Sequence, residues 1–223
     1  MVVAAGRGHR LGGGTPKQYR PIAGVPMVLR ALRPFTTHPE VAHVVLVLPA
    51  EDAAAPPEFL RGLTGAGLRL VAGGAERADS VAAGLGALDP ACTIVLVHDA
   101  ARPFVQRGVI DAVIAHARAG EGAVAAVRVS DTLKEAAPAD PTRIGRTVPR
   151  DGLWRAQTPQ GFPRAVLERA HHEAARAGAA TDDAALVERT GTAVRLVPDS
   201  PRNLKVTTAE DFALAELLAG SGE

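Results

Sequence analysis

Several residue types that dominate other classes of protein are scarce in this chain. One cysteine occurs in 223 residues, so no disulfide can form within the chain. No apolar run approaches the ~20 residues that a membrane-spanning helix needs. The first residues, MVVAAGRG, also lack the charged start and long apolar core of a signal peptide. We therefore expect a soluble protein of the cytoplasm.

Neither sign of charge is in excess. Lys and Arg number 25 and Asp and Glu 24, which gives a formal net charge of +1 and no global field to attract nucleic acid or a membrane surface. Neither is expected as a partner. The seven histidines are scattered and form no cluster at the spacing of a metal site held by the protein. Cys92 begins an apolar run and is interpreted as an inert core thiol.

What the chain has is enough apolar material for one core. Hydrophobic residues make up 47% of the sequence, so we expect a single domain over residues 1–223. Short runs rich in β-branched residues predict strands, and their apolar character is nearly continuous, as is typical of strands buried on both faces. These runs cover 41–49, 68–74, 92–100, 122–129 and 193–199.

Helical stretches alternate with these runs. They cover 27–35, 77–89, 108–120, 164–178 and 209–220. Repeated alternation of strand and helix is typical of an α/β doubly wound domain. We therefore predict a Rossmann-like fold with a mostly parallel sheet.

Residues 130–160 interrupt this alternation. They contain four prolines, no long helical pattern and the only tryptophan of the chain. Loops longer than ~12–15 residues without structure are uncommon and are usually functional, so we predict an inserted arm, with a plain surface loop as the alternative. Such an arm has too little core to fold alone. We expect it to bury Trp154 and Leu153 against a partner, most simply a second copy of the chain.

The densest chemical pattern lies at the start of the chain. Residues 4–19, AAGRGHRLGGGTPKQY, hold five glycines, three basic side chains, one histidine and no acid. If the first strand spans Val2 to Ala5, this loop leaves its carboxyl end, where open α/β sheets bind ligands. Glycines let backbone N–H groups converge on an anion, and the basic side chains suit phosphate oxygens. The loop predicts a polyphosphate site, with a solvated basic turn as the alternative.

Two common phosphate-binding motifs do not fit this loop. A dinucleotide fingerprint needs Gly-x-Gly-x-x-Gly, but after Gly6 and Gly8 the third position is Leu11. A Walker loop needs Gly-Lys followed by Ser or Thr, whereas Lys17 lies in the sequence PKQ. A Rossmann oxidoreductase and a P-loop enzyme are therefore disfavoured.

The remaining pattern, AAGxGxRLG followed by PKQ, resembles the opening of the nucleotidylyltransferases that act on sugar nucleotides and related compounds. Further blocks, in the same order, resemble the methylerythritol phosphate cytidylyltransferase family over nearly the whole chain. These blocks are GGAERADSV (73–81), VHDAARPF (97–104), DTLK (131–134), DGLWRAQTPQ (151–160), TDD (181–183) and NLKVTTAEDFALAE (203–216).

The resemblance implies transfer of a cytidylyl group from CTP to methylerythritol phosphate, with magnesium carried mainly by the CTP phosphates. It implies that the transferring phosphate is handled by four basic residues, Arg10, Lys17, Arg150 and Lys205. It implies nucleotide contacts from Ala4, Ala5, Gly6, Gly8, Gly73, Ser80 and Asp99. It implies contacts with the polyol phosphate from Asp99, Arg102, Thr132 and Thr158.

The resemblance also implies a twofold homodimer in which Thr132 and Arg150 of each arm reach the neighbour's active site. Without the resemblance, Lys205 would be interpreted as an exposed lysine and Arg150 as an ion-pair partner in the arm. Asp99 ends a predicted strand and is interpreted as a contact for substrate hydroxyls, with a capping residue as the alternative. Two other functions stay open, a ribitol phosphate cytidylyltransferase and a nucleotide-binding module without catalysis. The block HDAARP favours the methylerythritol enzyme over the ribitol one.

Overall fold

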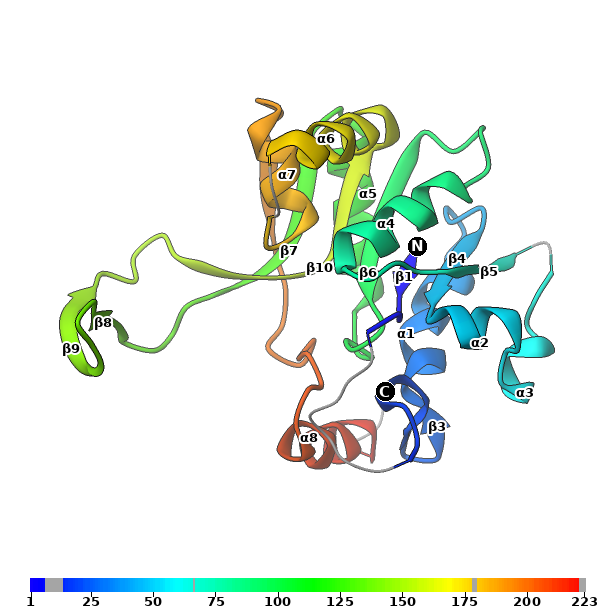
Figure 1. Cartoon of the computed structure of the whole chain (residues 1–223), viewed down its shortest axis with the longest axis horizontal. Helices are drawn as coiled ribbons and strands as arrows, with labels where there is room; N and C mark the ends of the chain where they lie inside the picture. Colours follow the sequence, from blue (N-terminus) through cyan, green and yellow to red (C-terminus); the bar gives the residue numbers. More distant parts are fainter. Residues whose placement is uncertain (7–13, 66, 178–179, 221–223) are drawn as a thin grey trace.

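The computed structural model describes residues 1–6, 14–65, 67–177 and 180–220. A seven-stranded sheet forms its centre, in the order β11-β7-β10-β6-β1-β4-β5 (Figure 1). The strands are β1 (Val2–Val3), β4 (Val44–Leu48), β5 (Leu68–Ala72), β6 (Ile94–Asp99), β7 (Gly122–Arg128), β10 (Trp154–Pro163) and β11 (Val194–Pro198). The pairs β1–β4, β1–β6, β4–β5 and β7–β11 are parallel. The predicted mostly parallel α/β fold is confirmed.

Both faces of this sheet are covered by helices. On one face α1 (Met27–Thr36) and α5 (Arg107–Arg118) share a hydrophobic cluster with the even-numbered residues of β4. On the other face α4 (Arg77–Gly86), α6 (Arg164–Ala177) and α7 (Asp183–Arg189) pack with Val45 and Val47 of the same strand. Successive side chains of a strand point to opposite faces, so every residue of the run VVLVL is buried. This burial explains the continuous apolar pattern of the sequence.

The five predicted helices are confirmed, the last being α8 (Ala209–Gly220). The sequence analysis missed several short elements. They are η2 (Lys17–Tyr19), the hairpin of β2 (Pro21–Ile22) and β3 (Val25–Pro26), α2 (Ala50–Ala54), α3 (Glu58–Arg61) and α7. None of the described helices combines the length and the apolar run needed to cross a membrane.

The predicted arm is too long at its carboxyl end. Residues 154–160 belong to β10, which lies between β6 and β7 and runs antiparallel to both. The polar sequence WRAQTPQGFP hides a buried strand because its amide side chains find protein partners. Gln160 Nε2 donates to Asp182 Oδ2 at 2.8 Å, and Gln160 Oε1 accepts from the Ala184 N–H at 2.9 Å.

Between β7 and β10 the chain forms a hairpin that projects far from the sheet, at the left of Figure 1. It consists of β8 (Leu133–Ala137) and β9 (Asp140–Val148), which pair antiparallel from Leu133 opposite Val148. At the base of the arm the Arg128 guanidinium lies 4.5 Å from the centre of the Trp154 ring. Trp154 is therefore half covered within its own chain.

Candidate active site

A cavity of about 230 Å³ lies beyond the carboxyl ends of β1 and β6, beside the loop that follows β5. Parallel strands end at the same edge of a sheet, and open α/β sheets bind their ligands there. The residues that line the cavity are Val3–Gly6, Lys17, Gln18, Met27, Gly74–Arg77, Ser80, Asp99–Ala101 and Lys205.

The cavity brings together seven of the predicted site residues from five separate parts of the sequence. They are Ala4, Ala5, Gly6, Lys17, Ser80, Asp99 and Lys205. Gly73 lies against them, because a Cβ built there would be 2.6 Å from the Ala5 Cβ and 2.7 Å from the Ser80 Oγ. A side chain at position 73 would therefore collide with the cavity wall. The predicted residues Gly8 and Arg10 lie outside the described residues.

Asp99 holds the charged centre of this site. Its Oδ2 is 2.7 Å from Lys205 Nζ and its Oδ1 is 3.3 Å from Arg77 Nε. Burial alone would raise the pKa of Asp99, but the positive charges of Arg77 and Lys205 outweigh burial and lower the pKa to about 2. Asp99 is therefore ionised at neutral pH, paired with two cations.

Arg77 was not predicted as a site residue. Its Nη1 lies 2.7 Å from Asp183 Oδ2, and Asp183 Oδ1 lies 2.9 Å from His171 Nε2. Arg77 is the first residue of α4, directly after the cavity loop. Its position in the block GGAERADSV was the one signal in the sequence that could have identified Arg77 as a site residue. Its carboxylate partner Asp183 is 106 residues away in the sequence.

Lys17 is hydrogen-bonded to the backbone next to Lys205. Its Nζ donates to the Val206 carbonyl oxygen at 3.1 Å, next to Lys205 in the chain. Ser80, predicted to border the base, is buried, and its hydroxyl holds the loop that follows β5. Ser80 Oγ donates to the Glu76 carbonyl oxygen at 3.1 Å and accepts from the Gly74 N–H at 3.3 Å.

A buried histidine fixes the turn after β6. His98 Nε2 lies 2.9 Å from the Arg102 carbonyl oxygen, which can only accept, so this nitrogen carries the proton. Its Nδ1 then accepts from the Thr158 hydroxyl at 3.0 Å, and Thr158 Oγ1 in turn accepts from the Asp99 N–H at 3.1 Å. Burial lowers the pKa of His98 to about 4, so the ring is neutral. The network places the Asp99 backbone.

With this geometry in place, the chain can be compared with known proteins. Residues 1–221 match the family described as 2-C-methyl-D-erythritol 4-phosphate cytidylyltransferase. The chain belongs to this family. A member from Salinibacter ruber is 44% identical over 221 residues, which cover 98% of this chain and 91% of that protein. A bifunctional IspD/IspF enzyme from Rhodospirillum rubrum is 47% identical over 226 residues, and this chain spans 57% of its length.

Solved structures of proteins from this family have the same fold. The cytidylyltransferase from Thermus thermophilus is 37% identical, with a TM-score of 0.81 over 98% of this chain and 97% of that one. The 4-diphosphocytidyl-2C-methyl-D-erythritol synthase from Anaerococcus prevotii is 26% identical, with a TM-score of 0.85 over 98% and 94% of the two chains.

Four residues that the family resemblance assigns to the polyol phosphate or the transferring phosphate are not among the described residues that line the cavity. Thr158 is buried beneath Asp99, with both hydrogen bonds described above. Arg102 lies beside the site, where its Nη1 donates to the Asn203 carbonyl oxygen at 2.8 Å. Thr132 and Arg150 are exposed on the arm, and the Arg150 guanidinium donates to the Ser130 carbonyl oxygen.

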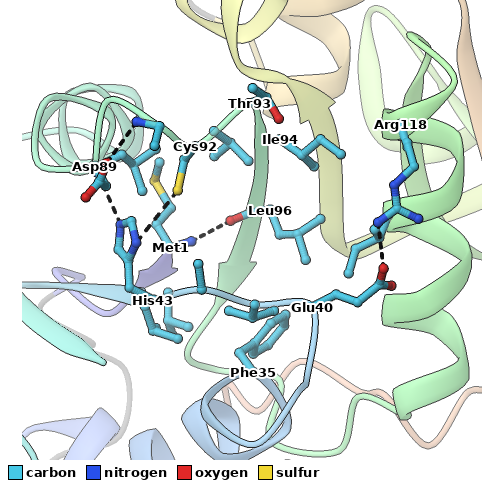
Figure 2. A pocket seen from close by; sticks show the side chains of 18 residues that line it. Met1, Phe35, Glu40, His43, Asp89, Cys92, Thr93, Ile94, Leu96 and Arg118 are labelled. Atoms are coloured by element: carbon cyan, nitrogen blue, oxygen red, sulfur yellow. Dashed lines mark hydrogen bonds and ion pairs between the residues drawn. The ribbon is translucent and has the colours of Figure 1, made fainter. Parts of the chain in front are cut away.

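A larger cavity, of about 590 Å³, lies at the opposite edge of the sheet (Figure 2). It is lined by the amino ends of β4 and β6, and none of the predicted site residues that the structure describes lines it. Cys92 is half-buried there, with its Sγ 3.7 Å from His43 Nδ1, so the prediction of a core thiol is wrong. Cys92 precedes β6 by two residues and lies at the rim of the sheet, outside the layer that the helices cover.

Proposed function

We propose that this chain transfers a cytidylyl group from CTP to 2-C-methyl-D-erythritol 4-phosphate. A phosphate oxygen of the acceptor attacks the α-phosphorus of CTP, the bond from that phosphorus to the bridging oxygen of the β-phosphate breaks, and pyrophosphate leaves. The chain belongs to this family, and one structural observation supports the proposal. Lys17 and Lys205 line the same cavity as the glycine-containing segment that follows β1.

The chemistry needs cations because both reactants are anions. Attack in line with the leaving group requires two phosphate groups to approach each other, and their repulsion has to be neutralised. Lys17 and Lys205 both line the cavity and supply ammonium groups there, with Lys17 Nζ donating to the carbonyl oxygen of Val206, the neighbour of Lys205. A preorganised charge in a site that excludes water stabilises a developing charge by about 3–4 kcal/mol. This value is an upper limit for Lys205, whose side chain is 46% exposed.

Asp99 and the backbone of Ala4 to Gly6 serve binding in this proposal. The Ala4 N–H already donates to the Val47 carbonyl oxygen at 2.8 Å, so the peptide N–H groups offered to phosphate oxygens are those of Ala5 and Gly6. The Asp99 carboxylate suits ribose or polyol hydroxyl groups. Ser80 and Gly73 form a close-packed wall for the cytosine, where no side chain fits at position 73. Arg102 lies beside Asp99, on the side where we expect the polyol phosphate.

Magnesium fits this site as an ion brought in by CTP. Among the described residues no group of three or more His, Cys, Asp or Glu side chains is placed to hold a metal. Asp99 and Glu76 are the acids that line the cavity, and both oxygens of Asp99 already face cations. Mg²⁺ is commonly held by one or two carboxylates together with substrate phosphates, and when bound it neutralises phosphate charge.

We further propose that two copies pair through their arms and complete each other's sites. In support, Ile144 and Leu153 of the arm are 60% and 38% exposed, an apolar surface that pairing would cover. Thr132 and Arg150 lie on the same projection. A twofold dimer would exchange these residues reciprocally. We also propose that the protein acts in the cytoplasm, because its proposed substrates are small anions.

The experiment is to incubate the purified protein and Mg²⁺ with each of the four nucleoside triphosphates and either 2-C-methyl-D-erythritol 4-phosphate or ribitol 5-phosphate. Release of pyrophosphate is then measured. We expect turnover with CTP and the methylerythritol compound to exceed every other pairing. Equal or faster turnover with ribitol 5-phosphate would refute the substrate assignment, and no turnover with any pair would refute the enzymatic function.

A further inference from the structure

A chain of paired charged and polar side chains runs from the cavity into the protein interior. It begins at Lys205, passes through Asp99 and Arg77 to Asp183, and ends at His171. The successive distances are 2.7, 3.3, 2.7 and 2.9 Å. The five residues come from the segment before α8, β6, α4, α7 and α6, so the chain joins separate elements of the fold.

Burial differs sharply between the two ends of this chain. The side chain of Asp183 is 1% exposed and that of His171 9%, whereas the side chain of Lys205 is 46% exposed. Asp99, in the middle, is 13% exposed. The inner end is fixed by packing, and the outer lysine has room to move. Lys205 therefore is the member that can change partner at little cost.

Arg77 bridges the fixed and exchangeable ends with two different nitrogens. Nε faces Asp99, and Nη1 faces Asp183. A planar guanidinium offers donors in several fixed directions, whereas a lysine ammonium is one compact charge on a flexible stem. Asp183 thus holds the arginine fork at an angle that keeps Nε directed at Asp99.

The function proposed above requires Lys205 to meet a substrate phosphate. When it does so, Asp99 loses one of its two cations while remaining mostly buried. The charged or titratable groups that then face Asp99 are Arg77 of α4, Arg102 of the following turn and the neutral His98 of its own strand. Of these, Arg77 is the cation in direct contact with the carboxylate.

We propose that Arg77 is a positioning residue for the reaction: anchored on Asp183, it holds the Asp99 carboxylate in place while Lys205 leaves Asp99 for a phosphate oxygen. The inference rests on the proposed function. Arg77 itself touches Asp99 and Asp183 and acts through Asp99.

The test compares Arg77→Gln, Arg77→Lys and Asp183→Asn with the matched control Arg69→Gln. Arg69 lies on β5, is exposed, and donates to the Ala87 carbonyl oxygen away from the cavity. For each variant kcat/KM is measured from pH 2.5 to pH 8 with CTP and the polyol phosphate, because the acid limb set by Asp99 lies near pH 2 in the wild type. Thermal unfolding at each pH verifies that the protein is folded.

We expect Arg77→Gln to lower kcat/KM at neutral pH by about 10-fold or more, because a hydrogen bond between two charged groups is lost. The loss of this cation raises the pKa of Asp99, and ionised Asp99 is lost as the pH falls through that pKa. The acid limb of the profile should therefore move upward by about one pH unit or more. Arg77→Lys keeps the charge but not the fork, and should lie between Arg77→Gln and the wild type.

A second measurement does not depend on turnover. Titration of ¹³C-labelled carboxyl groups by NMR, with Asp99→Asn to assign the resonance, reports the pKa of Asp99 directly. Arg77→Gln should raise it, because the cation in contact with the carboxylate is lost, and Arg69→Gln should not. Asp183→Asn keeps the Arg77 charge but removes its charged anchor, so it should lower kcat/KM without raising the pKa of Asp99. The inference is wrong if the folded Arg77→Gln protein shows the same Asp99 pKa as the wild type and, where it has measurable turnover, the same dependence of kcat/KM on pH. An inactive wild type would refute the proposed function and leave the carboxyl titration to decide the role of Arg77.

Discussion

Replacing Thr158 by valine should destabilise the protein strongly. Valine has nearly the shape of threonine, but its methyl group cannot replace the hydroxyl between the Asp99 N–H, at 3.1 Å, and His98 Nδ1, at 3.0 Å. His98 and Thr158 are buried, and the hydrogen bond from the Asp99 N–H is part-buried. A buried polar group left without a partner costs about 1–3 kcal/mol, so the two together cost about 2–6 kcal/mol of the free energy of unfolding.

The assay is unfolding by urea and by heat at one fixed protein concentration, with Thr158→Ser as the control. For a domain of this size 1 kcal/mol corresponds to roughly 2–4 °C in Tm, so Thr158→Val should lower Tm by roughly 4–24 °C. Serine keeps the hydroxyl and loses one methyl group, which costs about 1 kcal/mol. The structural reasoning would be refuted if the free energies of unfolding of Thr158→Val and Thr158→Ser agreed within about 0.5 kcal/mol and Thr158→Val only raised KM for the polyol phosphate. The hydroxyl would then serve the substrate.

Three further outcomes are expected. Lys17→Ala should lower kcat by about 100-fold or more, because a preorganised charge is lost from the transition state, and steady-state turnover within threefold of wild type would remove Lys17 from the mechanism. Arg102→Ala should mainly raise KM for the polyol phosphate, since a clamp on the ground state contributes uniform binding; an effect confined to CTP would place Arg102 at the nucleotide. Lys17→Ala and Arg150→Ala homodimers should each be nearly inactive, whereas doubly tagged mixed dimers should recover about half of wild-type pyrophosphate release, because both lesions fall in one site of the twofold pair. Mixed dimers as inactive as the parents would show that Arg150 acts within its own chain or only supports the arm.

The sheet could be predicted where local sequence determines burial. In β4 every side chain meets a helix on one face or the other, so the run VVLVL is apolar throughout and its length indicates a strand directly. β10 could not be predicted in the same way. The amide nitrogens of Gln160 and Gln157 donate to Asp182 and to the Asn203 carbonyl oxygen, partners that only the folded chain brings near.

The site was predictable to a similar extent. Asp99 and the segment after β1 follow from strands that end in polar or glycine-containing segments, whereas the assignment of Lys205 came from family resemblance. The role of Arg77 depends on Asp183, and the position of Thr158 depends on a strand that the sequence analysis placed in the arm. Contacts between residues that are far apart in the sequence, and that follow no periodic pattern, cannot be recognised from the local sequence. They become visible only in three dimensions.

The direction of β10 has a consequence for how this fold can diverge. Because β10 runs antiparallel to β7, the chain departs from the sheet at the end of β7 and returns to it at the same edge. Residues gained or lost at the tip of the β8–β9 hairpin therefore change only the reach of the projection and leave the strand register untouched. That edge is also where β1 and β6 end beside the cavity. Insertions and deletions at one exposed turn can thus be sampled in evolution without a stability penalty in the sheet, while altering what the projection delivers to a neighbouring molecule.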